Sequence, residues 1–307
     1  MSTRLPIAFF AMLGSLGQVV AQETARLTLG LYSFKQSTAV YKQFQPVAQA
    51  LGRSLTGHLE RPVTVELQVM KTYEECFEAF LAGKVDFVRF GPASYVLAKR
   101  RDAHLELLAA EREDSRKVGA IVVLDDSPFK TVKDLAGKRF AFGDQQSTIG
   151  RYLSQAELVR NGITGEKIAA FQYLDRHDIV FKAVELGDYD AGALHMETFK
   201  ELNAKATKKL RVLYSFNNAP KPWIARSGLD EAVVAALRSS LLELDDPTAL
   251  KALKVPGFAA TTDAEYQDVR KGMELSEKFA PEPVPAPKPA PAKEPVPAPA
   301  PAPGKRP

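Results

Sequence analysis

The sequence predicts an α/β protein made of two Rossmann-like lobes joined by a two-stranded hinge. Three observations predict this fold class. Strand-like and helix-like patterns alternate along most of the 307-residue chain, and they form two successive α/β units. Two stretches, near residues 113–118 and 215–222, are placed to cross between the units. Lobes connected in this way hinge about their crossovers and can close over a ligand held between them.

The first unit begins with alternating leucines, which predict a strand over residues 27–32. Apolar residues then recur every three or four positions from Tyr41 to Leu55, which predicts a helix. Similar patterns predict strands over 63–69, 85–90 and 105–110, and helices over 72–82 and 93–101. In sheets of this kind, ligands gather beyond the carboxyl ends of the strands.

The second unit repeats the alternation. Strands are predicted over 118–124, 139–142, 169–173, 190–194 and 211–216, and helices over 132–135, 149–161 and 177–186. Beyond Pro222 the pattern is mostly helical, with helices predicted over 230–244, 248–253 and 264–279. Thr262 and Glu265 have the spacing of a capping box at the start of the last helix.

The two ends of the chain predict export and an extended tail. Residues 1–21 contain Arg4, an apolar run and a small-residue ending, which is typical of a signal peptide cleaved near Ala21. We therefore expect an exported, periplasmic protein. Residues 281–307 hold 12 of the 21 prolines, which predicts a disordered Pro/Ala-rich tail.

Between these ends, we expect a first lobe from residues 22–115 together with 220–280, and a second lobe from 116–219. The formal net charge of +4, from 41 Lys and Arg against 37 Asp and Glu, does not indicate a nucleic-acid surface. Cys76 is the only cysteine, which argues against a disulfide framework, and the four histidines lack metal-ligand spacing. We expect a monomer with no cofactor and no metal.

An anion site is predicted where the strand over 139–142 turns into the following helix. Ser147 and Thr148 stand at the N-terminus of that helix, where unpaired backbone N–H groups and the helix dipole favour negative charge. Their hydroxyls add donors at the same place. The simpler alternative is that one of them only caps the helix. The two roles are compatible, because one hydroxyl can cap while the other faces a ligand.

Five runs in the chain resemble, in order and spacing, the periplasmic binding proteins of phosphate, phosphite and phosphonate ABC importers. These runs are 90–98, 134–139, 144–150, 162–163, and 177–178 with 187 and 190–193. The resemblance implies the type 2 periplasmic binding fold, in which two lobes close on a small oxyanion. It also implies a permease in the membrane as the partner.

The resemblance also implies roles for individual residues. Ser147, Thr148 and His177 match the residues that hold the phosphonate-type oxygens. Glu197 matches a carboxylate that contributes to binding the amino group of aminophosphonates. The second amine-binding carboxylate, an Asp before a Pro, is replaced by Lys221, and this departure speaks against an aminoalkylphosphonate ligand.

Four more side chains are candidates for the cleft. Tyr73 begins a predicted helix and Tyr95 follows a Gly-Pro break, so either phenol can reach the ligand or simply be buried with one satisfied hydroxyl. Tyr41 is a further candidate. Arg89 stands at the carboxyl end of a predicted strand and can offer a charge-assisted fork to an oxyanion, unless it is an ordinary surface arginine.

Three functions follow from these patterns. The first is a solute-binding protein that captures a phosphorus oxyanion by lobe closure and delivers it to an ABC importer. The second keeps the fold but reports the ligand to a membrane-bound sensor kinase. The third is an enzyme that uses Ser147 with His177 and Asp178. Because adjacent His and Asp residues do not align easily as relay partners, and no nucleophile elbow is present, we expect no enzyme.

Overall fold

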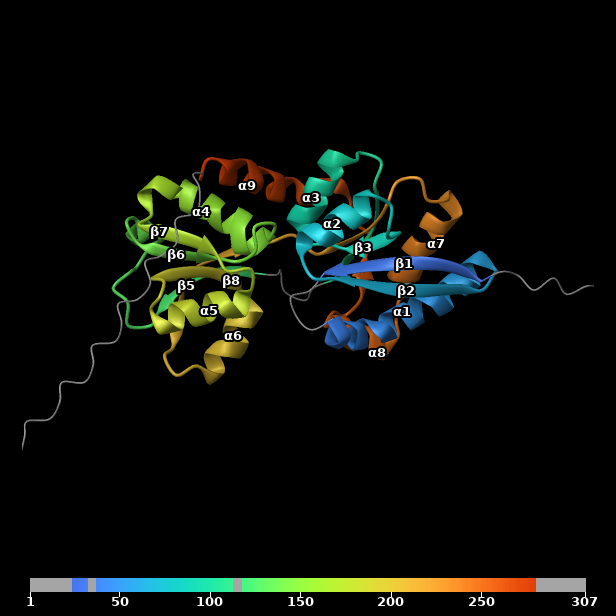
Figure 1. Ribbon diagram of the computed structural model, residues 1–307, viewed down its shortest axis with the longest axis horizontal. Helices are drawn as coiled ribbons and strands as arrows, with labels where there is room; N and C mark the ends of the chain where they lie inside the picture. Colours follow the sequence, from blue (N-terminus) through green and yellow to red (C-terminus); the bar gives the residue numbers. More distant parts are fainter. Residues whose placement is uncertain (1–23, 33–36, 113–117, 280–307) are drawn as a thin grey trace, which may run out of the picture.

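The computed structural model describes residues 24–32, 37–112 and 118–279, which form two α/β lobes side by side (Figure 1). The predicted signal peptide, most of the crossover near 113–118 and the proline-rich tail lie outside the described residues. The predicted α/β class with two lobes is confirmed, since each lobe has its own mixed sheet. Within the described part of the chain, no helix is both long and apolar enough to cross a membrane.

The first lobe is built on a six-stranded sheet in the order β11-β4-β10-β3-β1-β2. Strand β1 runs parallel to β2 and β3, whereas β10 is antiparallel to β3 and β4. The strands are β1 (Ala25–Tyr32), β2 (Val63–Met70), β3 (Phe87–Arg89), β4 (Glu106–Glu111), β10 (Pro222–Ala225) and β11 (Phe258–Ala259). The helices are α1 (Ser37–Leu59), α2 (Tyr73–Leu81), α3 (Pro92–Arg101), α7 (Glu231–Leu242) and α8 (Pro247–Leu253).

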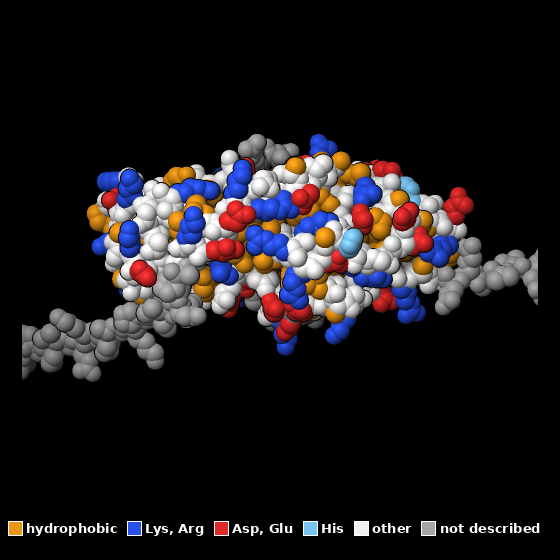
Figure 2. All heavy atoms as spheres, turned by 90° about the horizontal axis from the view of Figure 1, so that it is seen from above, with side chains coloured by type: hydrophobic (Ala, Val, Ile, Leu, Met, Phe, Trp, Pro, Cys, Tyr) orange, Lys and Arg blue, Asp and Glu red, His pale blue; other side chains and the backbone are white. Residues whose placement is uncertain are grey.

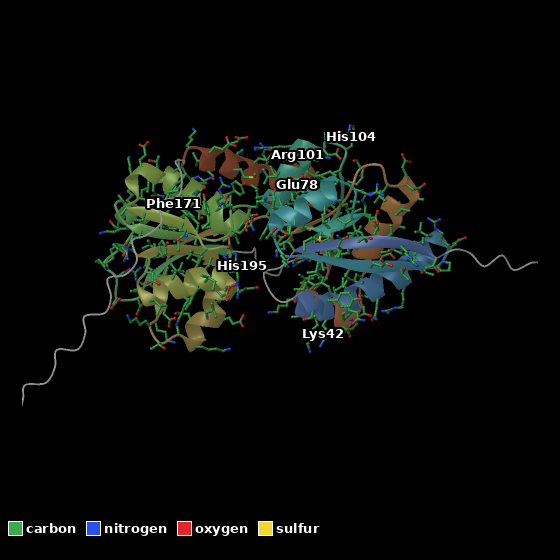
Figure 3. All side chains as sticks on the ribbon, viewed as in Figure 1. Lys42, Glu78, Arg101, His104, Phe171 and His195 are labelled. Carbon is green, nitrogen blue, oxygen red and sulfur yellow. The ribbon has the colours of Figure 1, made fainter. Side chains whose placement is uncertain are left out.

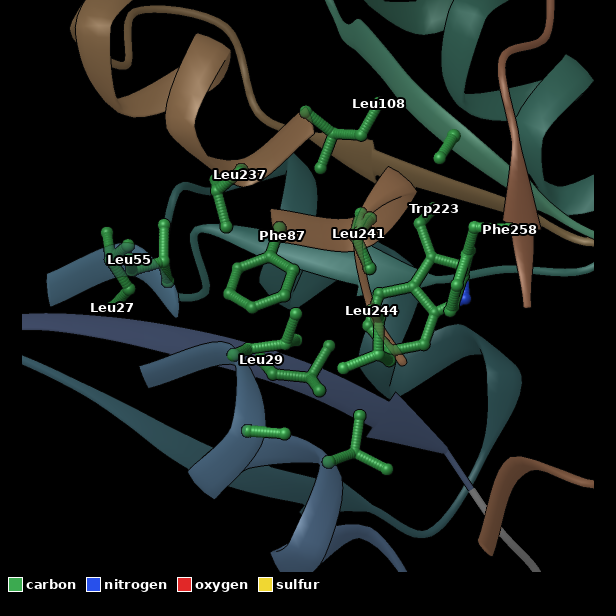
Figure 4. Packing of buried hydrophobic residues seen from close by; sticks show 14 of the residues in the cluster. Leu27, Leu29, Leu55, Phe87, Leu108, Trp223, Leu237, Leu241, Leu244 and Phe258 are labelled. Carbon is green, nitrogen blue, oxygen red and sulfur yellow. The ribbon is translucent and has the colours of Figure 1, made fainter. Parts of the chain in front are cut away.

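Buried apolar side chains from distant parts of the chain form the core of this lobe. Leu29 of β1, Phe87 of β3, Trp223 of β10 and Leu241 of α7 are completely buried in one cluster (Figure 4). Burial of each large apolar side chain stabilises the fold by roughly 1.5–3 kcal/mol. Trp223 and Leu241 therefore attach the returning end of the chain firmly to the sheet that the beginning of the chain started.

The second lobe has a five-stranded sheet in the order β7-β6-β8-β5-β9. Its strands are β5 (Val118–Leu124), β6 (Arg139–Phe142), β7 (Ala170–Tyr173), β8 (Ala191–His195) and β9 (Leu210–Asn217). Its α-helices are α4 (Ser154–Arg160), α5 (His177–Leu186) and α6 (Met196–Lys205). Shorter turns are η1 (Val132–Leu135), η3 (Gly165–Lys167) and the π-helical turn η2 (Thr148–Leu153), which runs directly into α4.

Two connections beyond β9 join the lobes. The chain passes from β9 of the second sheet to β10 of the first through residues 218–221, within the stretch predicted to cross. Helix α9 (Gln267–Glu277), preceded by η4 (Asp263–Tyr266), contacts α3 of the first lobe and α4 of the second (Figure 1). The stretch 220–280, which we assigned to the first lobe, therefore ends in a helix that contacts both lobes.

The apolar residues of α9 explain this position. Val269 and Met273 pack in a cluster with residues of α2 and α3, while Phe279, just beyond the helix, is buried in the core of the second lobe. The carbonyl of Phe279 also accepts a hydrogen bond from the N–H of Gly165 at 2.7 Å. Burial on both sides therefore holds the end of the described chain across the two lobes.

One α-helix and two strands of the structure were not predicted from the sequence patterns. Helix α6 follows β8 directly, and none of its residues is buried, although Met196, Phe199 and Leu202 pack partly against the core of the second lobe. Strand β10 lies in the middle of the first sheet and all four of its residues are buried. Strand β11 has only two residues. Short elements of this kind carry too few residues for a periodic pattern, and β10 also begins with a proline.

Candidate functional site

A cleft of about 600 Å³ lies between the lobes and is lined by residues of both. The strands of each sheet deliver side chains to it at their carboxyl ends, as expected for an open α/β sheet. Tyr32 ends β1, Arg89 ends β3 and His195 ends β8. His195 lies at the edge of the second lobe that faces the first (Figure 3). The lining also contains the predicted residues Ser147, Thr148, His177, Tyr73 and Glu197.

Four helical segments begin at this cleft. Pro92, Thr148 and His177 are the first residues of α3, η2 and α5, and Glu197 is the second residue of α6. The first N–H groups of a helix have no partner within the helix, and the helix dipole places partial positive charge there. Several N-termini that converge on one space make that space favourable for an anion.

The hydroxyls of Ser147 and Thr148 have different partners. Ser147 caps η2, because its Oγ accepts a hydrogen bond from the N–H of Gly150 at 2.9 Å. Thr148 Oγ1 accepts a hydrogen bond from the N–H of Ala93 at 2.9 Å, and Ala93 belongs to the first lobe. A hydroxyl that accepts from a backbone N–H still has its own O–H to donate. Thr148 therefore joins the lobes and keeps a donor for an oxyanion.

Two glycines shape the turn that carries these hydroxyls. Gly143 N–H donates to the Gly150 carbonyl at 2.8 Å, which folds η2 back against the end of β6. A Cβ at Gly150 would lie 2.8 Å from the Gly143 Cα, closer than side chains tolerate. Glycine at both positions therefore allows the close backbone approach that places Ser147 and Thr148 at the cleft.

His177 is a half-buried residue at the start of α5. Burial lowers its pKa to about 4, and the nearby positive charge of Lys221 acts in the same direction. The imidazole hydrogen-bonds the backbone of Ala193, while its Nδ1 has no hydrogen-bond partner among the described residues. The ring centroid of His195 is 6.4 Å away. His177 is therefore neutral at pH 7 and can offer one ring nitrogen to a ligand.

A pair of tyrosines lines the first-lobe side of the cleft. The rings of Tyr32 and Tyr73 lie with their centroids 3.8 Å apart. Burial raises the pKa of Tyr73 to about 12, while hydrogen bonds to Tyr32 and Ser147 act in the opposite direction. Both phenols therefore stay protonated, and their hydroxyls hydrogen-bond each other at the cleft. Sequence reasoning missed Tyr32, although its place at the carboxyl end of the first strand was the available signal.

Three predicted site residues have other roles in the structure. Tyr95 does not line the cleft: its hydroxyl donates to Asp263 Oδ1 at 2.6 Å, because α3 turns its ring toward η4. Tyr41 is 47% exposed on α1 and also lies outside the cleft lining. Arg89 does line the cleft, but both of its fork positions, Nε and Nη2, donate to the buried carboxylate of Glu111. Its charge is therefore offset within the first lobe.

Lysines dominate the charge of the cleft. Over the face shown in Figure 2, basic and acidic side chains are interspersed. The described lining of the cleft holds Lys221, Lys251 and Lys254 against one carboxylate, Glu197, once Arg89 is set against Glu111. The N–H of Glu197 donates to the Nδ1 of His195 at 3.3 Å. The sequence reasoning singled out Lys221 but missed Lys251 in α8 and Lys254 just after it, which lie far along the chain.

Comparisons with known proteins identify related chains and a shared fold. The chain is 25% identical over 229 residues to a probable ABC transporter phosphite-binding protein, PhnD1, of Prochlorococcus marinus, covering 67% of this chain and 76% of that protein. It is 28% identical over 178 residues to the phosphate-import protein PhnD of Mycolicibacterium smegmatis, covering 54% of each. The structure of Prochlorococcus marinus PhnD1 in complex with methylphosphonate has a TM-score of 0.71 at 22% identity. That likeness covers 82% of this chain and 98% of the solved one and shows a shared fold.

A family model describes most of the chain. Residues 29–266 match the family of periplasmic substrate-binding proteins of phosphonate ABC transporters. The match begins in β1 and ends with η4, so it includes both sheets and every described residue of the cleft lining. The chain therefore belongs to the phosphonate-binding family of periplasmic ABC-transporter proteins, and it is a binding protein of an importer, not an enzyme.

Proposed function

We propose that this protein captures a small phosphorus oxyanion, such as phosphate, phosphite or a phosphonate, by closure of its two lobes and presents it to an ABC permease. The observation that carries this proposal is the convergence of four helical N-termini at one cleft, with the hydroxyls of Ser147 and Thr148 among them. An oxyanion there receives backbone and hydroxyl donors, and the positive charge of Lys221 near His177 adds to the attraction.

The residues act in two groups. Thr148, Ser147 and His177 of the second lobe hold the oxygens of the ligand, and Tyr73 with Tyr32 closes the site from the first lobe. The Thr148 hydroxyl bonds Ala93 of the first lobe and faces the same cleft, so closure and ligand capture use the same group. Glu197 and Lys221 lie at the cleft and select among substituents on the ligand.

The names of similar proteins support this range of ligands. One relative is called a phosphite-binding protein, another a phosphate-import protein, and a solved structure of the same fold holds methylphosphonate. We further propose that the signal peptide is cleaved near Ala21, that the mature protein is a periplasmic monomer, and that the tail over 281–307 serves as a spacer.

Calorimetry on the mature protein tests the proposal with four ligands: phosphate, phosphite, methylphosphonate and 2-aminoethylphosphonate. We expect at least one of the first three to bind about tenfold more tightly than the aminophosphonate, because Lys221 repels an ammonium group. Tightest binding of the aminophosphonate would contradict the role of Lys221. Binding of none of the four would overturn the proposed function.

A further inference from the structure

Two of the three lysines of the cleft, Lys251 and Lys254, lie on its first-lobe side. Lys251 lies in the last turn of α8, and Lys254 follows that helix immediately. Both belong to the first lobe, whereas Ser147, Thr148 and His177 belong to the second. The cleft therefore has an oxyanion-binding side, made by helical N-termini, and an opposite side that carries full positive charges.

The side chains of Lys251 and Lys254 are accessible to a ligand in the cleft. Both residues are exposed, and neither side chain has a hydrogen bond or ion pair among the described residues. Their backbone is held in place, because Gln43 Nε2 of α1 donates to the carbonyl of Ala252 at 2.8 Å. The backbone that carries both lysines is therefore held in position beside the cleft.

The backbone of Lys254 is also unusual. Its φ of 59° places it in the left-handed region, where glycine or asparagine is the ordinary residue after a helix. A side chain with a Cβ is strained there, and such strain is found most often at functional positions. The turn itself does not require a lysine, so ending the helix does not account for this side chain.

The charge of the cleft indicates a ligand with more than one anionic group, and the cleft of about 600 Å³ has room for an organic ligand. Lys251 and Lys254 on the first-lobe side carry positive charge that a small anion held by Ser147, Thr148 and His177 does not neutralise. A second anionic group on the ligand would occupy this side.

We propose, on the basis of the function proposed above, that the cleft takes an organic phosphonate or phosphate ester that carries a second anionic group. The phosphorus oxyanion is held by Ser147, Thr148 and His177, and the second group is bound by Lys251 and Lys254, with Lys221 adding to the field. Because the two groups are bound by different lobes, the ligand itself bridges the closed cleft.

A simpler explanation of the lysines is that they only complement the negative end of the α8 dipole. That explanation accounts for Lys251 in the last turn, but Lys254 lies beyond the helix and bears the strained φ. The two explanations also predict different measurements. A dipole role predicts that charge removal lowers stability without changing which ligand is preferred, whereas a binding role predicts a changed preference.

Calorimetry at fixed ionic strength distinguishes the dipole role of these lysines from a ligand-binding role. Methylphosphonate is compared with phosphonoacetate and 3-phosphonopropionate, which add a carboxylate at two distances from the phosphorus. We expect at least one of the two carboxylate ligands to bind about tenfold more tightly than methylphosphonate. The double variant Lys251→Gln with Lys254→Gln should lose most of that preference, and Lys251→Arg with Lys254→Arg should retain it.

The matched control is Lys130→Gln with Lys133→Gln, which removes the same charge from exposed positions of the second lobe outside the cleft lining. It should leave the preference unchanged. Equal or weaker binding of both carboxylate ligands overturns the inference alone, as does a preference that survives in the Lys251 and Lys254 double variant. Binding of neither methylphosphonate nor any other phosphorus oxyanion overturns the proposed function, and the inference with it.

Discussion

The hydroxyl of Thr148 accepts a hydrogen bond from the backbone N–H of Ala93 across the two lobes. Ala93 lies in the first turn of α3, and Gly91 before that helix offers no side-chain cap. Thr148 thus satisfies from the opposite lobe an N–H group that would otherwise be left unpaired. The same threonine begins η2 at the cleft. The same side chain therefore takes part both in contact between the lobes and in the geometry of the anion site.

Thr148→Val removes this hydroxyl while nearly preserving the shape of the side chain. We expect the dissociation constant for the preferred phosphorus ligand to rise about tenfold, since a donor and an interlobe bond are lost together. Calorimetry measures the affinity, and urea unfolding measures the stability. Thr131→Val at the start of η1, which lies away from the cleft, is the control and should leave affinity unchanged. An unchanged affinity in Thr148→Val would remove this residue from the site.

Ser147→Ala tests the capping role of the neighbouring hydroxyl. Loss of the bond from Gly150 N–H should lower the free energy of unfolding by about 1 kcal/mol, as for other helix caps. If the hydroxyl also contacts ligand, the affinity falls as well. A variant with unchanged stability and reduced affinity would mean that the cap contributes little and that ligand contact is its main role.

The tyrosines Tyr73 and Tyr95 should respond in opposite ways to loss of their hydroxyls. Tyr73→Phe removes a donor at the cleft and should weaken ligand binding several-fold with little effect on stability. Tyr95→Phe removes the bond to Asp263 and should lower the free energy of unfolding by about 1 kcal/mol without changing affinity. Each variant serves as the control for the other. Reduced ligand affinity in Tyr95→Phe would restore that residue as a candidate.

His177 should make the unliganded protein sensitive to acid. Its pKa is lowered from 6.5 in the unfolded chain to about 4 in the fold, so the unfolded state takes up a proton first as the pH falls. Its contribution to stability is complete above pH 6.5 and is lost as the pH falls from 6.5 to about 4, to a total of about 3 kcal/mol. Urea unfolding at a series of pH values measures this loss.

The comparison for this experiment is His177→Gln, which should show a shallower decline of stability over the same pH range. His104→Gln replaces an exposed histidine of the first lobe and should follow the wild-type curve. Parallel curves of unfolding free energy against pH for the wild type and His177→Gln would show that protonation of His177 does not cause the loss of stability in acid.

Arg89 and Glu111 form a buried ion pair whose loss should be costly. The Glu111 side chain is fully buried and also accepts from Trp223 Nε1 at 3.1 Å, while the Arg89 side chain is 18% exposed. Arg89→Ala leaves the carboxylate buried without its cation and should lower the free energy of unfolding by about 3 kcal/mol. The double variant Arg89→Met with Glu111→Leu should regain much of that loss. Chemical denaturation checks both values.

The ligand affinity of this double variant tests whether Arg89 also contacts the ligand. If Arg89 acts only through Glu111, the double variant should bind phosphate and methylphosphonate nearly as well as the wild type. A large loss of affinity in the folded double variant would instead place the guanidinium on the ligand, which is one of the two roles that the sequence left open.

Short sequence patterns correctly predicted those features that depend only on residues a few positions apart in the chain. The turn after β6 placed Ser147 and Thr148 at a helix start, and the capping box of Thr262 and Glu265 is present as predicted. Tyr95 shows the limit of such signals. Its position after a Gly-Pro break was correctly read as a helix start, but its hydroxyl is directed to Asp263, 168 residues away.

The sequence by itself determined the alternation of strands and helices, the two-lobed class and the helix start that carries Ser147 and Thr148, because these depend on periodicity and capping within a few residues. The tertiary structure decided the rest. It inserted β10 into the middle of the first sheet, paired Arg89 with Glu111, and brought Lys251 and Lys254 to the cleft. These features depend on partners far apart in the chain, and only burial and packing choose among such partners.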